Sequence, residues 1–125
     1  MPPITTSQTA RSTTTAAATI TTLASPSLGS HELCSWRVMM AADAVGPVHT
    51  IDREQIWLPV SGHLEFTIDG TVHSATAGEA AIVPAGSLRQ VRALDEPAEA
   101  LVCMPIGGMA GVPGQAEPVR LPWAE

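Results

Sequence analysis

Four side chains in two short segments have the types needed for acid–base chemistry on a small molecule. His49, Gln55 and Trp57 lie close together in the chain, and Arg89 follows in a later segment. Histidine titrates near neutrality, so His49 is the natural general acid or base. An arginine can stabilise an enolate or another oxyanion, and a glutamine amide can orient a carbonyl or hydroxyl group. The indole of Trp57 offers a flat apolar wall for a ring or a polyene.

Short strands separated by turns must position these groups. From Glu32 onward, apolar-rich runs alternate with Gly- and Pro-containing turns, and no long helical pattern is visible. The pair Asp69-Gly70 is a strong hairpin signal. The expected strands cover residues 33–40, 49–60, 63–68, 71–75, 80–83, 88–94 and 99–104. So many short strands predict an all-β sandwich or barrel, whose inner face becomes a ligand pocket where side chains do not fill it.

The N-terminal 25 residues differ in composition, since twelve of them are Ser or Thr and Arg11 is their only charged residue. This segment is either a flexible tail or, over residues 16–23, a strand along a sheet edge of its own barrel or of a partner subunit. We therefore divide the chain into an N-terminal extension (1–30), a barrel (31–110) and a C-terminal tail (111–125).

Composition excludes several function classes. A chain of 125 residues makes about one domain. The net charge is −6 and no lysine is present, which argues against nucleic-acid and anionic membrane partners. No apolar run approaches the roughly 18 residues of a membrane span, and the first residues lack the pattern of a secretory signal. We expect a cytoplasmic protein in which Cys34 and Cys103 are free thiols.

The spacing around the candidate residues is specific. His49-Thr50-Ile51 is followed by three residues, then Gln55, then six residues, then Gly62. Further along, Gly78 is followed by five residues, then a Pro-Ala-Gly turn, then two residues, then Arg89. Fifteen residues separate the two glycines.

This pattern resembles the two motifs of the cupin family, over about residues 33–106. The resemblance implies a small single-domain cupin of the RmlC-like jelly-roll superfamily, a double-stranded β-helix barrel with a Ser/Thr-rich N-terminal extension. It also implies that His49, Gln55, Trp57 and Arg89 all point into the barrel. Strand alternation agrees for Ile51, Gln55 and Trp57.

The departures from the family pattern bear on metal binding. The family's usual site is three histidines and one glutamate, and only His49 keeps its residue type here. Ile51 cannot ligate a metal, Gln55 is a weak neutral ligand, and the guanidinium of Arg89 repels a cation. A transition metal needs three or four N, O or S donors. We therefore expect a degenerate site with no metal and no other cofactor.

The favoured function is that of a metal-independent cyclase or isomerase acting on an apolar, carbonyl-bearing molecule. In this hypothesis His49, Arg89 and Gln55 are catalytic, and the substrate also contacts Trp57. The remaining apolar lining is expected from Ile51, Leu58, Met39, Met104 and Cys103. We expect Arg89→Ala to reduce turnover and to leave the fold intact. The Ala-rich, Lys-free composition is similar to that of actinobacterial proteins, where natural-product pathways of the polyketide kind are common.

Other interpretations stay open. His49 could be a core histidine bonded to Gln55, Arg89 could close the barrel through a salt bridge, and Trp57 could be core packing. The barrel could also be a non-catalytic binding or sensor cupin, while a metal-dependent oxygenase is disfavoured by Ile51 and Arg89. By resemblance we expect a homodimer, with the N-terminal segment as the strand that covers a sheet edge.

Overall fold

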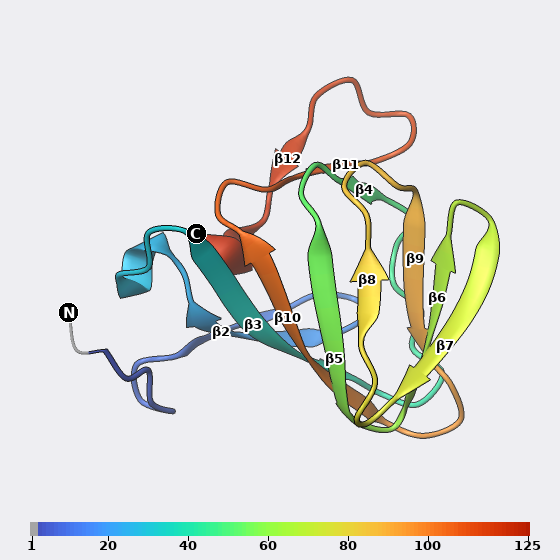
Figure 1. The fold of residues 1–125 in the computed structure, drawn as a ribbon, viewed down its shortest axis with the longest axis horizontal. Helices are drawn as coiled ribbons and strands as arrows, with labels where there is room; N and C mark the ends of the chain where they lie inside the picture. The colour runs from blue at the N-terminus through green and yellow to red at the C-terminus, as the bar shows by residue number, and fades with distance from the viewer. Residues whose placement is uncertain (1–2) are drawn as a thin grey trace.

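The structure, a computed structural model, describes residues 3–125. Within these residues, twelve β-strands and two single-turn 3-10 helices are joined by turns and loops (Figure 1). The elements in chain order are β1 (Arg11–Thr14), β2 (Thr19–Ala24), η1 (Pro26–Leu28), β3 (Leu33–Met40), β4 (Thr50–Ile51), β5 (Gln55–Ser61), β6 (His63–Ile68), β7 (Thr71–Thr76), β8 (Ala81–Val83), β9 (Arg89–Ala93), β10 (Ala98–Pro105), β11 (Met109–Gly111), β12 (Val119–Arg120) and η2 (Pro122–Ala124). The predicted all-β class is confirmed. Neither helical turn within residues 3–125 is long enough to cross a membrane.

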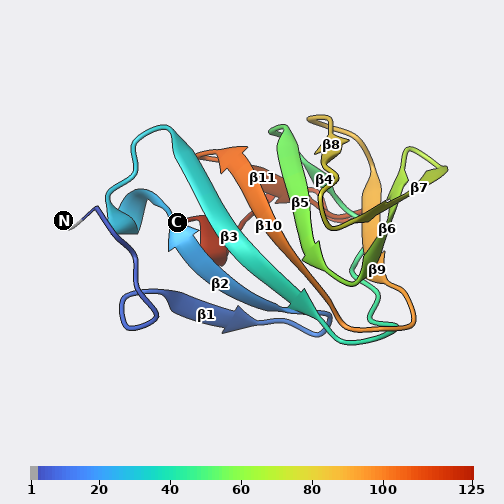
Figure 2. The same cartoon turned by 60° about the horizontal axis from the view of Figure 1, so that its bottom comes forward.

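The strands form three sheets that wrap into a jelly-roll barrel. The largest has the order β1-β2-β3-β10-β5-β8, and the two smaller ones have the orders β7-β6-β9 and β12-β11-β4. Figure 2 shows β2, β3, β10 and β5 side by side in one wall, with β9, β6 and β7 at the far end of the barrel. All strand pairs within the sheets are antiparallel.

Alternation along the strands decides which side chains fill the interior. In β3, Trp36, Val38 and Met40 are buried, whereas Arg37 and Met39 face outward. The same period of two holds in β10, where Ala98, Ala100, Val102 and Met104 are buried. Because successive side chains of a strand point to opposite faces, these even-numbered positions build the inner face of the six-stranded sheet.

The predicted hairpin is confirmed in detail. β6 and β7 pair from His63 to Ile68, and Asp69 and Gly70 are the two loop residues. Both loop residues have positive φ, 48° and 84°. This is the backbone of a type I′ turn, whose twist matches that of the flanking strands. The predicted strand over 49–60 is instead divided into β4 and β5 by a bend at residues 52–54.

The N-terminal segment is part of the chain's own sheet. β2 pairs with β3, placing Ile20 opposite Val38, and β1 adds a further strand at the edge. β2 therefore lies close to the strand expected over 16–23, and β1 was not anticipated. The sequence allowed this strand to serve its own barrel or a partner, and here it serves its own.

The C-terminal segment closes one end of the barrel against the N-terminal strands. β12 pairs with β11, and Leu121 and Ala124 are buried. The hydroxyl of Thr22 donates to the backbone oxygen of Trp123 at 2.7 Å. Arg11 donates to the backbone oxygen of Pro122 at 3.0 Å and also to that of Glu125. η2 therefore packs against β1, β2 and β3, and Figure 2 shows it beside β2.

Candidate active site

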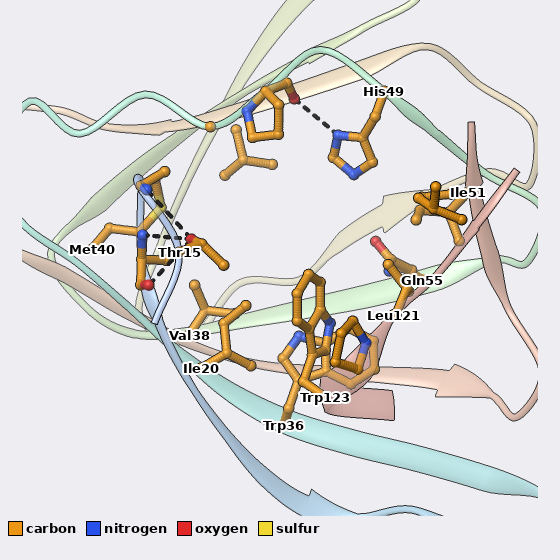
Figure 3. Close-up of a pocket in the computed structure, with 18 of the residues that line it drawn as sticks. Thr15, Ile20, Trp36, Val38, Met40, His49, Ile51, Gln55, Leu121 and Trp123 are labelled. Carbon is orange, nitrogen blue, oxygen red and sulfur yellow. Dashed lines mark hydrogen bonds between the residues drawn. The ribbon is translucent and has the colours of Figure 1, made fainter. Parts of the chain in front are cut away.

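A cavity of about 400 Å³ lies between the six-stranded sheet, the His49 segment and the two terminal segments (Figure 3). Its volume is within the range of small-molecule sites. The residues that line it are Thr15, Ala17, Ala18, Ile20, Trp36, Val38, Met40, Gly46, Pro47, His49, Ile51, Gln55, Trp57, Val91, Ala110, Val112, Val119, Arg120, Leu121, Pro122 and Trp123. Most of these side chains are apolar, so the few polar groups among them determine the chemistry of the site.

His49 presents a free basic nitrogen to this cavity. Its backbone exchanges two hydrogen bonds with Arg89, at 3.0 and 2.8 Å. Its Nδ1 lies 2.9 Å from the carbonyl oxygen of Pro47. Because a carbonyl can only accept, Nδ1 carries the hydrogen of the neutral ring and Nε2 carries the lone pair. Figure 3 shows this second ring nitrogen directed into the cavity.

The imidazole of His49 is held neutral. Burial lowers its pKa because it disfavours the charged ring, and the positive charge of Arg89 lowers it further. The hydrogen bond to Pro47 acts in the opposite direction but is smaller than the effect of burial. His49 is therefore an unprotonated base at neutral pH.

Gln55 is buried, with 4% of its surface exposed, and its amide has a defined orientation. Its Oε1 accepts hydrogen bonds from Trp57 Nε1 at 3.2 Å and from Arg89 Nη1 at 3.3 Å. Its Nε2 donates to the sulfur of Met104 at 3.6 Å. Since the oxygen is engaged by two donors, the amide NH₂ is the end with a hydrogen to spare.

Arg89 is placed behind Gln55 and is not among the lining residues. It is 3% exposed. Its guanidinium donates to the backbone oxygens of Ser87 (3.1 Å) and Pro84 (2.8 Å) and to the Ser87 hydroxyl (3.1 Å). No ion pair of Arg89 is found among residues 3–125. Arg89 thus faces oxygens of its own chain, where the sequence suggested a ligand oxygen or a carboxylate.

This placement changes the expected result of removing Arg89. We expect Arg89→Ala to lower the free energy of unfolding by about 3 kcal/mol, because it removes four hydrogen bonds made by a buried side chain. The matched control is Arg92→Ala on the same strand. Arg92 is 48% exposed and pairs with Glu65 at 2.7 Å, so its loss should cost far less than the loss of Arg89. Urea unfolding measures both, and equal losses would contradict a buried structural role for Arg89.

The other predicted lining residues divide by strand face. Ile51 is buried and lines the cavity, and Met104 is buried but outside the lining. Met39 and Leu58 are 49% and 39% exposed, on the outer face of the six-stranded sheet. Cys103 also lies outside the lining, because it alternates with the buried positions of β10. A one-residue difference along a strand reverses the side on which a side chain lies.

Several lining residues were not anticipated. Trp36, Val38 and Met40 share one face of β3, and the charged Arg37 between the first two was a usable signal for this face. Leu121 and Trp123 come from the tail, where the sequence carries no periodic pattern. Their place in the cavity wall follows from long-range packing alone.

These observations define the class of the protein as a jelly-roll barrel that encloses a cavity lined by side chains. A family model described as the cupin domain matches residues 36–104, and the chain belongs to the cupin family. Ten of the 21 lining residues fall within this match, four precede it and seven follow it. More than half of the lining residues therefore come from segments outside residues 36–104, the part of the chain that we call the family core.

Solved structures share the fold at low sequence identity. The polyketide cyclase RemF from Streptomyces resistomycificus is 15% identical with a TM-score of 0.77, covering 94% of this chain and 89% of its own. An RmlC-like cupin from Shewanella frigidimarina is 17% identical with a TM-score of 0.72, covering 84% and 91%. Oxalate decarboxylase from Bacillus subtilis is 18% identical with a TM-score of 0.71. The similarity covers 78% of this chain but only 27% of the decarboxylase chain. A comparison with curated proteins finds no match.

The donor set at the family's metal positions does not fit a transition metal. Ile51 has no donor atom, and the Gln55 oxygen already accepts two hydrogen bonds. The positive charge of Arg89 lies next to that oxygen. Within residues 3–125, no three His, Cys, Asp or Glu side chains gather where they could hold an ion. His49 alone cannot supply the three or four donors that such a metal requires.

Proposed function

We propose that this cupin is a metal-independent enzyme of the cyclase or isomerase type, acting on an apolar, carbonyl-bearing small molecule. The observation that carries the proposal is the neutral imidazole of His49, whose Nδ1–H is held by Pro47 and whose Nε2 faces an apolar cavity. A general base must be unprotonated at the working pH and must reach the substrate, and the neutral tautomer of His49 meets both conditions. The shared fold of a polyketide cyclase supports a substrate of the polyketide kind.

The proposed step is removal of a proton from a carbon next to a carbonyl group. Nε2 of His49 takes the proton, and the electrons of the broken C–H bond move to the carbonyl oxygen as an enolate. The Nδ1–H bond to Pro47 stabilises the imidazolium that forms. Where the substrate has a β,γ double bond, the enolate is a dienolate, and return of the proton to its γ carbon moves the double bond and gives isomerisation. Attack of the enolate carbon on a second carbonyl forms a ring, and loss of water then completes a cyclisation.

Gln55 is the candidate group for the enolate oxygen. Its oxygen is engaged by Arg89 and Trp57 and one amide hydrogen is directed at Met104, so the second amide hydrogen is the donor that we assign to the enolate oxygen. The positive charge behind the amide oxygen polarises the amide and strengthens its N–H donors. In this proposal Arg89 is a positioning residue that acts through Gln55, and His49 and Gln55 are the catalytic residues.

A non-catalytic binding or sensor cupin is the second candidate. The observation that favours it is the orientation of Arg89, whose guanidinium is satisfied by its own chain and leaves no buried cation to stabilise an oxyanion directly. The two functions differ in consumption, because an enzyme turns over excess ligand and a binder saturates at one ligand per site.

Deuterium exchange tests the proposed proton transfer without knowledge of the natural substrate. The probe is 2-tetralone, an apolar ketone with acidic C–H bonds, in D₂O, with exchange followed by proton NMR. We expect the protein to accelerate exchange about 100-fold over the same concentration of free imidazole. Saturable binding of 2-tetralone with exchange no faster than in imidazole would favour the binding function.

A further inference from the structure

All three tryptophans of the chain line the same cavity. The chain has no tyrosine and one phenylalanine, so nearly its entire aromatic content is gathered at this site. The three indoles come from β3, β5 and η2, which are far apart in the sequence. Aliphatic side chains fill much of the remaining lining. Flat apolar surfaces of this kind favour stacked or edge-on contact with another ring system.

Each indole is held by the fold. Trp36 and Trp57 are both register partners of Val102, so they lie in one row across β3, β10 and β5. Trp57 donates its Nε1–H to Gln55 and packs edge-on against Phe66, at 5.5 Å and 79°. These contacts leave the indole of Trp57 little freedom to turn away from the cavity, and the indole of Trp36 is buried on the inner face of the same sheet.

Trp123 differs from Trp57 because its indole N–H is buried and unpaired. Its backbone oxygen accepts the bond from Thr22, which anchors the residue. Its Nε1 is buried and has no hydrogen-bond partner among the described residues. A buried donor without a partner is costly, so the indole of Trp123 contributes to the cavity through its ring and not through its N–H.

The polar end of the cavity selects the functional group of the ligand. His49 Nε2 is a hydrogen-bond acceptor, since the single ring hydrogen is on Nδ1. A ligand oxygen that meets it must therefore be a donor, such as a phenolic or enolic hydroxyl. An ether or ketone oxygen cannot fill this role, although the acidic C–H of a ketone can meet the same nitrogen in the proposed proton transfer. No Asp or Glu of the described residues lines the cavity, so a cationic ligand would find no partner there. Arg120 does line the cavity, but it pairs with Glu125 at 3.7 Å, which reduces its attraction for an anionic ligand.

We propose that the cavity binds a neutral, planar aromatic molecule with a phenolic or enolic hydroxyl turned toward His49. The rings lie against the indoles of Trp36, Trp57 and Trp123. This inference rests on the proposed function in using the same cavity and the same histidine, and it adds the class of substrate. It assigns Trp123, which lies outside the family core, as a residue that determines ligand specificity.

Three matched probes test the ligand class by isothermal titration calorimetry. They are 2-naphthol, its saturated counterpart decahydro-2-naphthol, and its ether 2-methoxynaphthalene. We expect 2-naphthol to bind about tenfold more tightly than the saturated alcohol, because only the aromatic rings gain stacking. We expect it to bind about fivefold more tightly than the ether, which has no hydrogen to donate to His49. Equal affinity within either pair would overturn the proposal.

Variants of Trp123 and His49 assign the two effects to residues. Trp123→Leu should weaken 2-naphthol about tenfold and Trp123→Phe less than about threefold, because phenylalanine keeps a ring. His49→Phe should abolish the difference between 2-naphthol and its ether. Equal losses in both Trp123 variants, or a preference for the hydroxyl that survives His49→Phe, would count against the assignment. If His49→Phe fails to fold, the comparison of 2-naphthol with its ether on the wild-type protein decides.

The binding assay tests the ligand class and the exchange assay tests the proton transfer, so the failure of one proposal can be distinguished from the failure of the other. Correct probe preferences without deuterium exchange would support the ligand class and disprove the proposed proton transfer. Exchange of 2-tetralone without a preference for aromatic hydroxyls would support the enzyme and overturn the ligand class.

Discussion

Replacing His49 with glutamine is expected to reduce deuterium exchange into 2-tetralone by about 10²–10⁴-fold, the usual contribution of a positioned general base. Glutamine is polar and close in size but has no basic lone pair near neutral pH. The cavity and the Gln55–Arg89 pair should remain, because the Arg89 guanidinium does not bond to the His49 ring. Proton NMR measures the exchange rate in wild type and variant at equal, saturating probe.

The matched control for this substitution is His73→Gln. His73 is exposed on β7, away from the cavity lining, so its loss should leave the exchange rate unchanged. Such a result separates catalysis at the site from exchange by surface imidazoles. An exchange rate that survives His49→Gln, or that falls equally in both variants, would refute the role of His49.

The pH profile of exchange supplies a second test of His49. Burial lowers the pKa of this imidazole below its ordinary value of about 6.5. The basic form is therefore already complete near neutrality, and the rate should be flat above about pH 6.5 and fall as the ring becomes protonated below it. The same shift favours the unfolded state in acid. As pH falls, the unfolded histidine takes up its proton first, so stability is lost below about pH 6.5 and fully present above it.

Replacing Gly62 with alanine is expected to lower the free energy of unfolding by at least about 3 kcal/mol. A Cβ at this position would lie 2.3 Å from the backbone oxygen of Pro97 and 2.6 Å from the Cα of Ala98. Backbone cannot yield as a flexible side chain can, so the strands themselves must shift. Gly62 also has a φ of 75°, which adds the cost of the left-handed region for a residue with a Cβ.

The control is Gly70→Ala in the hairpin loop. Gly70 has a φ of 84°, but a Cβ there meets no atom within 4 Å. Its replacement should therefore cost only the backbone term, about 1–2 kcal/mol. Urea unfolding compares the two variants at matched temperature and pH. If Gly62→Ala were no worse than Gly70→Ala, close contact with the start of β10 could not be the reason for glycine at position 62.

Local patterns were enough to predict much of the barrel. The alternation of Leu64, Phe66 and Ile68 with polar neighbours predicted β6 with its correct bounds, because a strand's two faces follow from its own period of two. The pair Asp69-Gly70 predicted its turn, because few residues tolerate positive φ at both positions. The motif spacing placed His49, Ile51 and Gln55 on the cavity side by resemblance to cupins, and all three line the cavity.

Other features depended on contacts between distant parts of the chain. Arg89 was expected to face a ligand oxygen or a carboxylate. Its partners are instead Pro84 and Ser87, in the turn between β8 and β9, and Gln55 at the start of β5. Met39 was expected to line the cavity, yet Met40 does. The hydrophobicity of two neighbouring methionines does not distinguish the faces of a strand; the flanking Arg37 does.

The sequence by itself determined the barrel class, its main strands and turns, and the presence of a single histidine at the degenerate motif. Only the tertiary structure decided that the terminal segments close the cavity and that Trp123 joins Trp36 in its wall. The bond from Thr22 to Trp123 joins residues 101 positions apart. No local periodicity encodes such a contact, because it forms only when the tail has an assembled sheet against which to pack.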